Sequence, residues 1–320
     1  MSALQLRTAA VAGAGTMGAG IAGLLARAGL RVRLLDRTEE ILDRGLAALR
    51  ASQDSLVEAG RLTQANAEQA ERRVTPVTTL EAAAVDVDFF LEALPEEASI
   101  KKDFLARADA LCPARAVFVS NTSGLSITDL ASSTRRPERF AGMHFFNPPH
   151  VVPLVEVVRG DLTSDDTAAF LLAAARAWGK RPVLVRREVP GFLANRLQFA
   201  VFREALHMLE QGYASAEDID TAMTAGPGLR WGLLGPLRIA DLGGLDIFTV
   251  ISGYLFKELS AGTEPPELLK KLVADGRAGA KTGGGFYEYR EGEAASLSAR
   301  RDRVLLAFLD AIEREEKRHD

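Results

Sequence analysis

The stretch GAGTMG at residues 13–18 limits the fold of this chain more than any other feature of its sequence. It follows an apolar run that has the character of a strand and leads into an alanine- and leucine-rich run with helical periodicity. In such a strand–turn–helix unit the first glycine allows a tight turn, the second lets the backbone approach a pyrophosphate, and the third permits close helix–strand packing. Free N–H groups at the helix start favour an anion. The pattern predicts a dinucleotide site formed by Gly13, Gly15, Thr16, Met17 and Gly18.

An acidic residue, Asp36, ends the next predicted strand, about 20 residues after the first glycine. A carboxylate at this place can accept hydrogen bonds from both ribose hydroxyls of the cofactor and would repel a 2′-phosphate. The sequence therefore predicts NAD as the cofactor. Arg37 is a further candidate contact, and its charge softens the discrimination against NADP. The alternative is a packing turn followed by a solvated aspartate.

The first half of the chain alternates apolar runs with segments of helical period. Strand with intervening helix is typical of βαβ units, which build a parallel sheet covered on both faces. The runs LVEVV and RPVLVRR are expected to extend the far side of the sheet. The predicted fold class is α/β, with an N-terminal Rossmann doubly wound sheet followed by an all-α domain. The five predicted strands are residues 8–13, 31–36, 87–94, 116–121 and 139–146.

The sequence pattern changes after Val189-Pro190-Gly191, where long runs with helical periodicity replace the runs rich in β-branched residues. We therefore predict an NAD-binding domain at residues 1–190 and a helical substrate and dimerisation domain at 191–320. The segment from 293 onwards has apolar residues at helical spacing and is expected to form an amphipathic helix that packs on the body or on a subunit partner.

Composition excludes several other classes. The chain has 320 residues and a net charge of −4, which argues against a nucleic-acid or anionic-membrane binder. No run is long enough to span a bilayer, and the spacing of the N-terminal glycines disfavours a signal peptide. The single cysteine, Cys112, allows no internal disulfide and no thiolate cluster. We expect a cytoplasmic protein without a metal.

Histidine is the usual base for removing the proton of an alcohol during hydride transfer. Of the four in this chain, His319 lies in a charged tail, His207 in a helical run and His150 in a proline-rich turn. His144 ends a predicted strand, and ligands gather at the carboxyl ends of strands in such sheets. From position alone, His144 is as readily a core histidine as a catalytic one.

Glu156 lies in the apolar run LVEVV, where an unpartnered carboxylate would be costly. Pairing with His144 would hold one imidazole tautomer and stabilise the imidazolium that forms in alcohol oxidation. The alternative is a half-exposed glutamate on an edge strand.

Several segments together resemble the L-3-hydroxyacyl-CoA dehydrogenase family, in order and spacing, to about residue 290. The resemblance implies the two domains above, a cleft between them, NAD-dependent oxidation of an L-3-hydroxyacyl-CoA in fatty acid metabolism, and a homodimer. The matching segments are GAGTMG, FLEALPEE, SNTSGLSI, GMHFFNPP, LVEVV, PGFLANRLQ, GPLRIADLGGLD and KTGGGFYEY.

The resemblance also implies roles for single residues. His144 matches the catalytic base, Glu156 its partner, and Ser123 and Asn195 the groups near the substrate's 3-oxygen. Other positions match contacts to the nicotinamide half of NAD or lie in the active-site loops. These are Glu96, Lys101, Asn121 and Asn147.

The match departs where family members carry lysines that meet the phosphates of CoA. Ser55 and Glu58 stand there instead, and Arg61 remains as the main cation; the SNTS segment continues with Gly124 instead of a second serine. The loss of charge-assisted bonds should weaken a CoA handle. GPGLRWGLLGPL is similar to L-gulonate 3-dehydrogenase (λ-crystallin) and carnitine dehydrogenase, so a free 3-hydroxy acid is an alternative substrate. A non-catalytic, crystallin-like NAD-binding protein is the alternative of another class.

Overall fold

We analysed a computed structural model that describes residues 6–318. The chain divides into two compact units, the first ending at Arg196 and the second beginning at Leu197. The division falls in the first turn of a helix, after the Pro190-Gly191 break on which the boundary near 190 was predicted. Residues that follow the break remain with the first unit because backbone N–H groups of Leu193 and Ala194 are bound to Glu156.

The first unit is built on one eight-stranded sheet with the order β3-β2-β1-β4-β5-β6-β7-β8. All neighbours are parallel except β6 and β7, so the last two strands run against the other six. This is the predicted doubly wound α/β sheet, with LVEVV and RPVLVRR on its far side. The strands are β1 (Thr8–Ala12), β2 (Arg31–Leu35), β3 (Val74–Val77), β4 (Phe89–Glu92), β5 (Val117–Ser120), β6 (Phe140–Phe145), β7 (Leu154–Val158) and β8 (Arg181–Val185).

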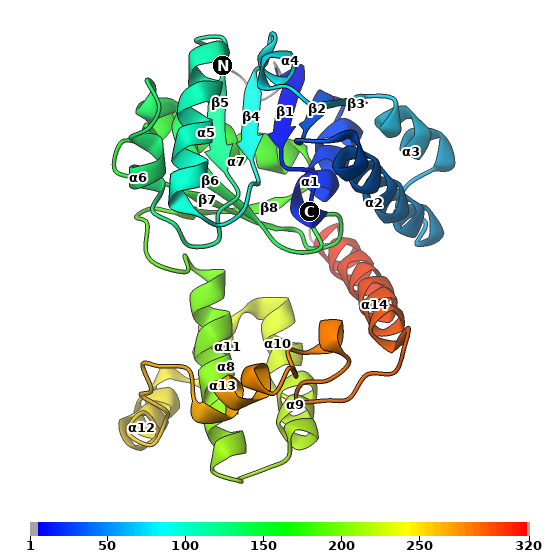
Figure 1. The fold of residues 1–320 in the computed structure, drawn as a ribbon. Coiled ribbons are helices and arrows are strands. Elements are labelled where there is room, and N and C mark those ends of the chain that lie inside the picture. The colour runs from blue at the N-terminus through cyan, green and yellow to red at the C-terminus, as the bar shows by residue number, and fades with distance from the viewer. Residues whose placement is uncertain (1–5, 319–320) are drawn as a thin grey trace. The chain divides into compact units, whose positions relative to one another are not determined.

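Two helical layers cover the sheet and enclose separate cores (Figure 1). One core packs the sheet against α1 (Thr16–Arg27), α2 (Glu39–Glu58) and α7 (Asp165–Ala177). The other packs it against α4 (Leu80–Ala84), α5 (Ala98–Leu111) and α6 (Ile127–Ala131). The central strands β1, β4, β5 and β6 are buried on both faces, which explains their almost continuous apolar sequences. The remaining elements of this unit are α3 (Gln64–Glu71) and the 3-10 turn η2 (Pro137–Arg139).

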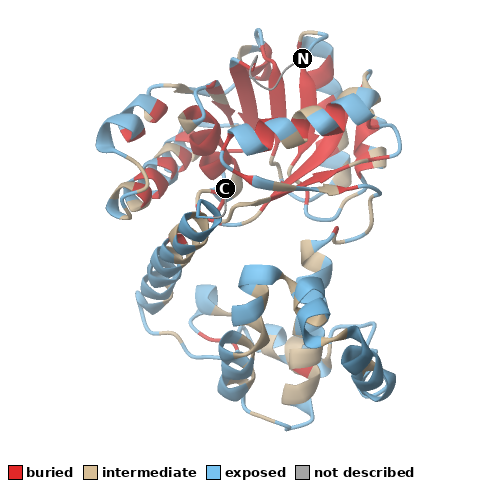
Figure 2. Cartoon of the chain, turned by 180° about the vertical axis from the view of Figure 1, so that it is seen from behind, coloured by how far each residue is buried: buried red, intermediate tan, exposed pale blue. Residues whose placement is uncertain are grey.

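The described residues of the second unit form helices, as predicted, with two isolated β-bridges in the turn around Gly284. Of its described residues, only Leu206 and Leu306 are buried hydrophobic side chains. Figure 2 shows the contrast, with buried residues gathered in the sheet unit and the helices of the second unit mostly exposed. Its elements are α8 (Ala194–Glu210, which starts in the first unit), α9 (Ala216–Ala225), α10 (Pro227–Leu234), α11 (Pro236–Gly243), α12 (Leu245–Leu255), α13 (Glu267–Ala274), the 3-10 turn η3 (Ala280–Thr282) and α14 (Glu293–Glu316).

Within the described part of the chain, no helix is both long and apolar enough to cross a membrane.

Candidate active site

The glycine-rich turn between β1 and α1 has the geometry that its sequence predicts. Gly13 adopts a φ of +100°, a conformation that side chains rarely tolerate. A Cβ on Gly18 would overlap the carbonyl oxygen of Gly13, so the helix packs on the turn without room for a side chain. No side chain in the described part of the chain caps α1, whose first N–H groups therefore remain available to an anion. Gly15 and Thr16 are exposed at this helix start. These features fit the pyrophosphate of a dinucleotide.

Asp36 lies directly after β2 and closes the other side of the turn. Its Oδ2 accepts a hydrogen bond from the N–H of Ala14 at 2.7 Å, and its Oδ1 accepts one from the N–H of Arg37 at 2.7 Å. Each carboxylate oxygen has further acceptor capacity, so the group can still receive the ribose hydroxyls. The carboxylate therefore fixes the turn and also offers hydrogen-bond acceptors to the ribose.

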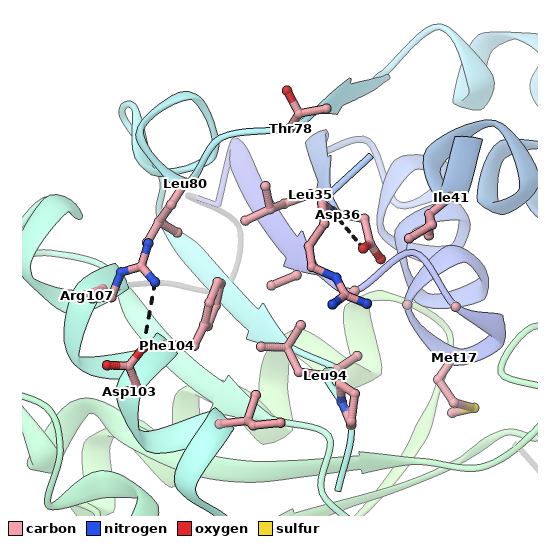
Figure 3. A pocket seen from close by; sticks show the side chains of 18 of the residues that line it. Met17, Leu35, Asp36, Ile41, Thr78, Leu80, Leu94, Asp103, Phe104 and Arg107 are labelled. Carbon is pink, nitrogen blue, oxygen red and sulfur yellow. Dashed lines mark hydrogen bonds and ion pairs between the residues drawn. The ribbon is translucent and has the colours of Figure 1, made fainter. Parts of the chain in front are cut away.

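A cavity of about 990 Å³ opens beside this turn (Figure 3). It is lined by the glycine turn and Asp36 together with largely apolar side chains, Leu35, Leu80 and Phe104 among them. Arg107, which forms an ion pair with Asp103, lies at one side. A lining that joins polar groups with apolar side chains suits an adenosine, whose ribose needs acceptors and whose base needs flat apolar surfaces.

Replacing Asp36 by Ala is expected to raise KM for NAD by about 10- to 100-fold, because hydrogen bonds to a charged group are worth about 1.5–3 kcal/mol. KM for NADP should fall at the same time, since the repulsion of the 2′-phosphate is lost and Arg37 remains. Initial rates with both cofactors measure this. Asp36→Asn, which keeps an acceptor for Ala14, is the control for the integrity of the turn. An unchanged preference between the two cofactors would contradict this role of Asp36.

His144 and Glu156 form a buried pair at the antiparallel step of the sheet. They stand directly opposite each other on β6 and β7, and side chains so placed share one face of the sheet. The distance from His144 Nδ1 to Glu156 Oε2 is 2.8 Å, and the side chains are 5% and 0% exposed. The rings of Phe146 and Phe192 lie against the imidazole, at centroid distances of 4.5 and 5.8 Å. The half-exposed alternative for Glu156 is therefore wrong.

The second oxygen of Glu156 is also occupied. Oε1 accepts hydrogen bonds from the N–H groups of Leu193 and Ala194, both at 2.9 Å, where α8 begins. Burial raises the pKa of this carboxyl, but the bonds from His144, Ala194 and Leu193 outweigh it and hold the pKa below its usual value. An ionised Glu156 accepts the Nδ1–H of His144, which leaves Nε2 of His144 with a free lone pair. The arrangement supplies a base.

Ser123 and Asn195 come from different elements and are joined by a hydrogen bond, and Asn195 directly follows Ala194, whose N–H is bound to Glu156. Ser123 follows β5, and its carbonyl accepts a hydrogen bond from Nδ2 of Asn195 at 3.4 Å. Asn121, at the end of the same strand, accepts one from the N–H of Phe145 at 2.9 Å and so fixes the loop to β6. Asn147 is exposed in the loop after β6. Arg61 lies in the turn after α2, where its N–H donates to the carbonyl of Leu56.

Glu96 lies at the edge of the candidate site, whereas the side chain of Lys101 is buried. Glu96 accepts a hydrogen bond from the N–H of Ser123 at 2.8 Å, at the edge of the candidate site. The ammonium of Lys101 is 1% exposed and lies 2.7 Å from Glu92, a residue that the sequence analysis did not single out. The sequence could have identified Glu92, because it is a carboxylate in an apolar run, as Glu156 is.

Other candidate groups lie outside this arrangement. His207 packs on Tyr213 in the second unit, and His319 lies outside the described residues. Cys112 is buried, which raises the pKa of its thiol to about 12. Between residues 6 and 318, no three or more His, Cys, Asp or Glu side chains gather as metal ligands.

Comparison with known proteins agrees with this geometry. The model of the 3-hydroxyacyl-CoA dehydrogenase NAD-binding domain matches residues 8–189, and that of the C-terminal domain of the same enzymes matches residues 191–289. A probable 3-hydroxybutyryl-CoA dehydrogenase of Bacillus subtilis is 38% identical over 90% of this chain and 99% of its own length. A 5-formyl-3-hydroxy-2-methylpyridine 4-carboxylate 5-dehydrogenase of Mesorhizobium japonicum is 33% identical over 97% of this chain and 99% of its own.

Solved structures give the same assignment. The structure of a 5-formyl-3-hydroxy-2-methylpyridine 4-carboxylic acid 5-dehydrogenase, described as an NAD⁺-dependent dismutase, has a TM-score of 0.90 at 33% identity and covers 97% of this chain and 99% of that one. The structure of (S)-3-hydroxybutyryl-CoA dehydrogenase from Ralstonia eutropha has a TM-score of 0.74 at 37% identity, with 90% and 100% covered. Together with the nucleotide turn and the His144–Glu156 pair, these matches show that the chain belongs to the 3-hydroxyacyl-CoA dehydrogenase family of NAD-dependent oxidoreductases.

Proposed function

We propose that this protein catalyses the reversible NAD-dependent oxidation of an L-3-hydroxyacyl-CoA to the 3-ketoacyl-CoA, with His144 as the general base. The buried His144–Glu156 pair is the observation that carries the proposal, because it leaves Nε2 of the imidazole as a proton acceptor. Relatives named as hydroxyacyl- or hydroxybutyryl-CoA dehydrogenases, 38% identical over most of the chain, support the substrate class.

In this reaction, we assign each residue the following role. Nε2 of His144 takes the proton of the C3 hydroxyl, and the ionised Glu156 stabilises the imidazolium that results. Ser123 and Asn195 hold the substrate oxygen. In the reverse direction, the protonated His144 returns the proton to the 3-keto oxygen. NAD, when bound, supplies the acceptor for the hydride that leaves C3.

The glycine turn and the carboxylate beside it are the proposed cofactor contacts, with Thr16, Met17 and Arg37 around them. Asn147 and Arg61 are proposed substrate contacts. Glu96 is proposed to border the nicotinamide, as is the loop that Asn121 fixes. We propose a cytoplasmic role in fatty acid metabolism.

A free acid is a second candidate substrate, and two observations favour it. The exposed face of α2 carries Asp54 and Glu58 near its end, whereas Arg50 is already paired with Glu71. Acidic groups at this place would repel the phosphates of CoA. The pyridine-carboxylate dehydrogenase, whose name includes no CoA ester, is also matched over nearly the whole of both chains.

The two substrates can be separated in one assay. NADH oxidation is measured with acetoacetyl-CoA, and NAD reduction with L-gulonate and with L-carnitine. Turnover of the thioester alone is the expected result. Turnover of a free acid alone would replace the thioester proposal by the second candidate and would make Glu58 the decisive departure from the family.

We further propose that the protein is a homodimer formed through its helical unit. Exposed apolar side chains crowd α11 and α12, including Leu237 at 83% and Val250 at 70% exposure. Apolar patches of more than a few hundred Å² are rare on monomers and mark interfaces. A second copy of the helical unit would cover them.

Replacing Val250 by Glu is expected to weaken this dimer by about tenfold or more, because an unpaired carboxylate would be buried in the interface. Sedimentation velocity over a concentration series measures the effect. Leu162→Glu, at a residue of the first unit that is 50% exposed, is the matched control and should leave the dimer intact. A wild-type protein that sediments as a monomer would refute the proposal.

A further inference from the structure

A buried ion pair lies at the end of β4, next to the loop that carries Ser123. Glu92 is the last residue of β4 and is fully buried, and Lys101 in α5 is 1% exposed. Lys101 Nζ lies 2.7 Å from Glu92 Oε1. A buried ion pair contributes little net stability, because both charges lose their hydration. The geometry that the pair imposes on its surroundings is therefore the more informative property.

Both side chains use their polar atoms in one connected network. The second oxygen of Glu92 accepts a hydrogen bond from Ser120 Oγ at 2.6 Å, at the end of β5. Lys101 also donates to the carbonyl of Leu94 at 2.9 Å and lies 3.3 Å from Oε2 of Glu96. The pair thus joins three segments: the ends of β4 and β5 and the first turns of α5.

Glu96 carries this network to the candidate active site. Its Oε1 accepts hydrogen bonds from the hydroxyl of Thr122 and from the N–H of Ser123. Burial opposes ionisation, but these bonds and the charge of Lys101 hold the pKa of Glu96 below its usual value. Glu96 is therefore a carboxylate at neutral pH, held by an ammonium on one side and holding the backbone of Ser123 on the other.

We propose that Glu92 is a positioning residue for the dehydrogenase reaction, acting through Lys101 and Glu96 on the backbone of Ser123. The catalytic part of this inference rests on the proposed function, which places the Ser123 side chain on the substrate oxygen; the fixing of the loop does not. Without the Glu92 carboxylate, Glu96 is the one carboxylate among residues 6–318 that remains paired with the ammonium of Lys101, and the ammonium draws it away from Ser123. A displacement of about 1 Å at a reacting group lowers turnover by about 10²-fold.

The test compares Glu92→Gln with Asp109→Asn. Asp109 is a second buried carboxylate of α5, about two turns beyond Lys101, and is paired with Arg136 at 2.6 Å. Each substitution removes one buried charge and leaves its cation, so the two variants share the structural penalty. Only Glu92 is connected to Ser123. Ser120→Ala removes one donor to Glu92 and also the acceptor for the N–H of Thr122, with little change in volume, and serves if Glu92→Gln does not fold.

Two readouts are taken at a temperature where all variants are folded: hydrogen–deuterium exchange at the Ser123 amide, and kcat with NAD. In Glu92→Gln we expect exchange to be faster by about tenfold and kcat to be lower by about 10- to 100-fold. Ser120→Ala should shift both in the same direction by less, and Asp109→Asn should shift neither.

Unchanged exchange at Ser123 in both Glu92→Gln and Ser120→Ala would overturn the inference. Faster exchange with an unchanged kcat would also overturn it, because the loop would then move without consequence for the reaction. A wild-type protein that turns over no 3-hydroxy substrate would instead defeat the proposed function, and the exchange data would still decide whether Glu92 fixes the loop.

Discussion

Replacing His144 by Gln is expected to lower kcat by about 10²- to 10⁴-fold while leaving NAD affinity nearly unchanged. The glutamine side chain cannot accept and release a proton near neutral pH, whereas the cofactor groups at the β1–α1 turn are untouched. Steady-state rates and NADH titration by fluorescence measure the two quantities.

A matched control is available in the second unit. His207 lies in α8 and packs on Tyr213. It is distant in sequence from His144 and Glu156 and packs on a different residue. His207→Gln should therefore keep its turnover within about twofold, as surface changes usually do. Wild-type turnover in His144→Gln would remove His144 from the mechanism.

Replacing Glu156 by Gln is expected to lower kcat by a similar factor, about 10²- to 10⁴-fold, although the two side chains have nearly the same shape. The reason is the direction of the hydrogen bonds. The N–H groups of Leu193 and Ala194 require an acceptor, so the amide oxygen of Gln must take the place of Oε1. Its NH₂ group then faces Nδ1 of His144, which must accept, and the imidazole proton moves to Nε2. The base is thereby lost.

Glu188→Gln is the control for this substitution. Glu188 is another carboxylate that accepts hydrogen bonds from two consecutive backbone N–H groups, those of Ile127 and Thr128, at the start of α6. It makes no bond to a histidine in the described structure. Its replacement should cost stability without changing kcat. If Glu156→Gln turned over like Glu188→Gln, the imidazole tautomer would not matter and the proposed role of Glu156 would be wrong.

Periodicity and turn chemistry were sufficient to predict most of the fold. The strands around the nucleotide turn, the two strands at the far side and the helical second unit are confirmed. β3 was missed because its sequence VTPV includes Pro76 and it lies half-buried at the edge of the sheet, where a proline does not interrupt a ladder on both sides. β4 and β5 are equally short, but they are buried throughout and lie in apolar runs, so the sequence predicted them.

The candidate site depended more on tertiary structure. The sequence showed a histidine and a glutamate in apolar runs twelve positions apart, but not the antiparallel register that places them opposite each other. Ser123 and Asn195 are distant in sequence and were found only through the resemblance. Lys101 was predicted from the same resemblance as a nicotinamide contact, and only the packing of α5 on β4 shows its ammonium to be buried against Glu92. Their catalytic and binding roles stay predictions.

The central claim is tested most directly by following the hydrogen on C3 of the substrate. The substrate selected by the assay above is deuterated at C3 and oxidised by the wild-type protein. The reduced cofactor is then isolated, and its mass is measured by mass spectrometry. We expect the deuterium in the isolated NADH, and we do not expect the proton of the hydroxyl there. Deuterium in the solvent, or oxidised product without deuterated NADH, would contradict hydride transfer assisted by the His144–Glu156 pair.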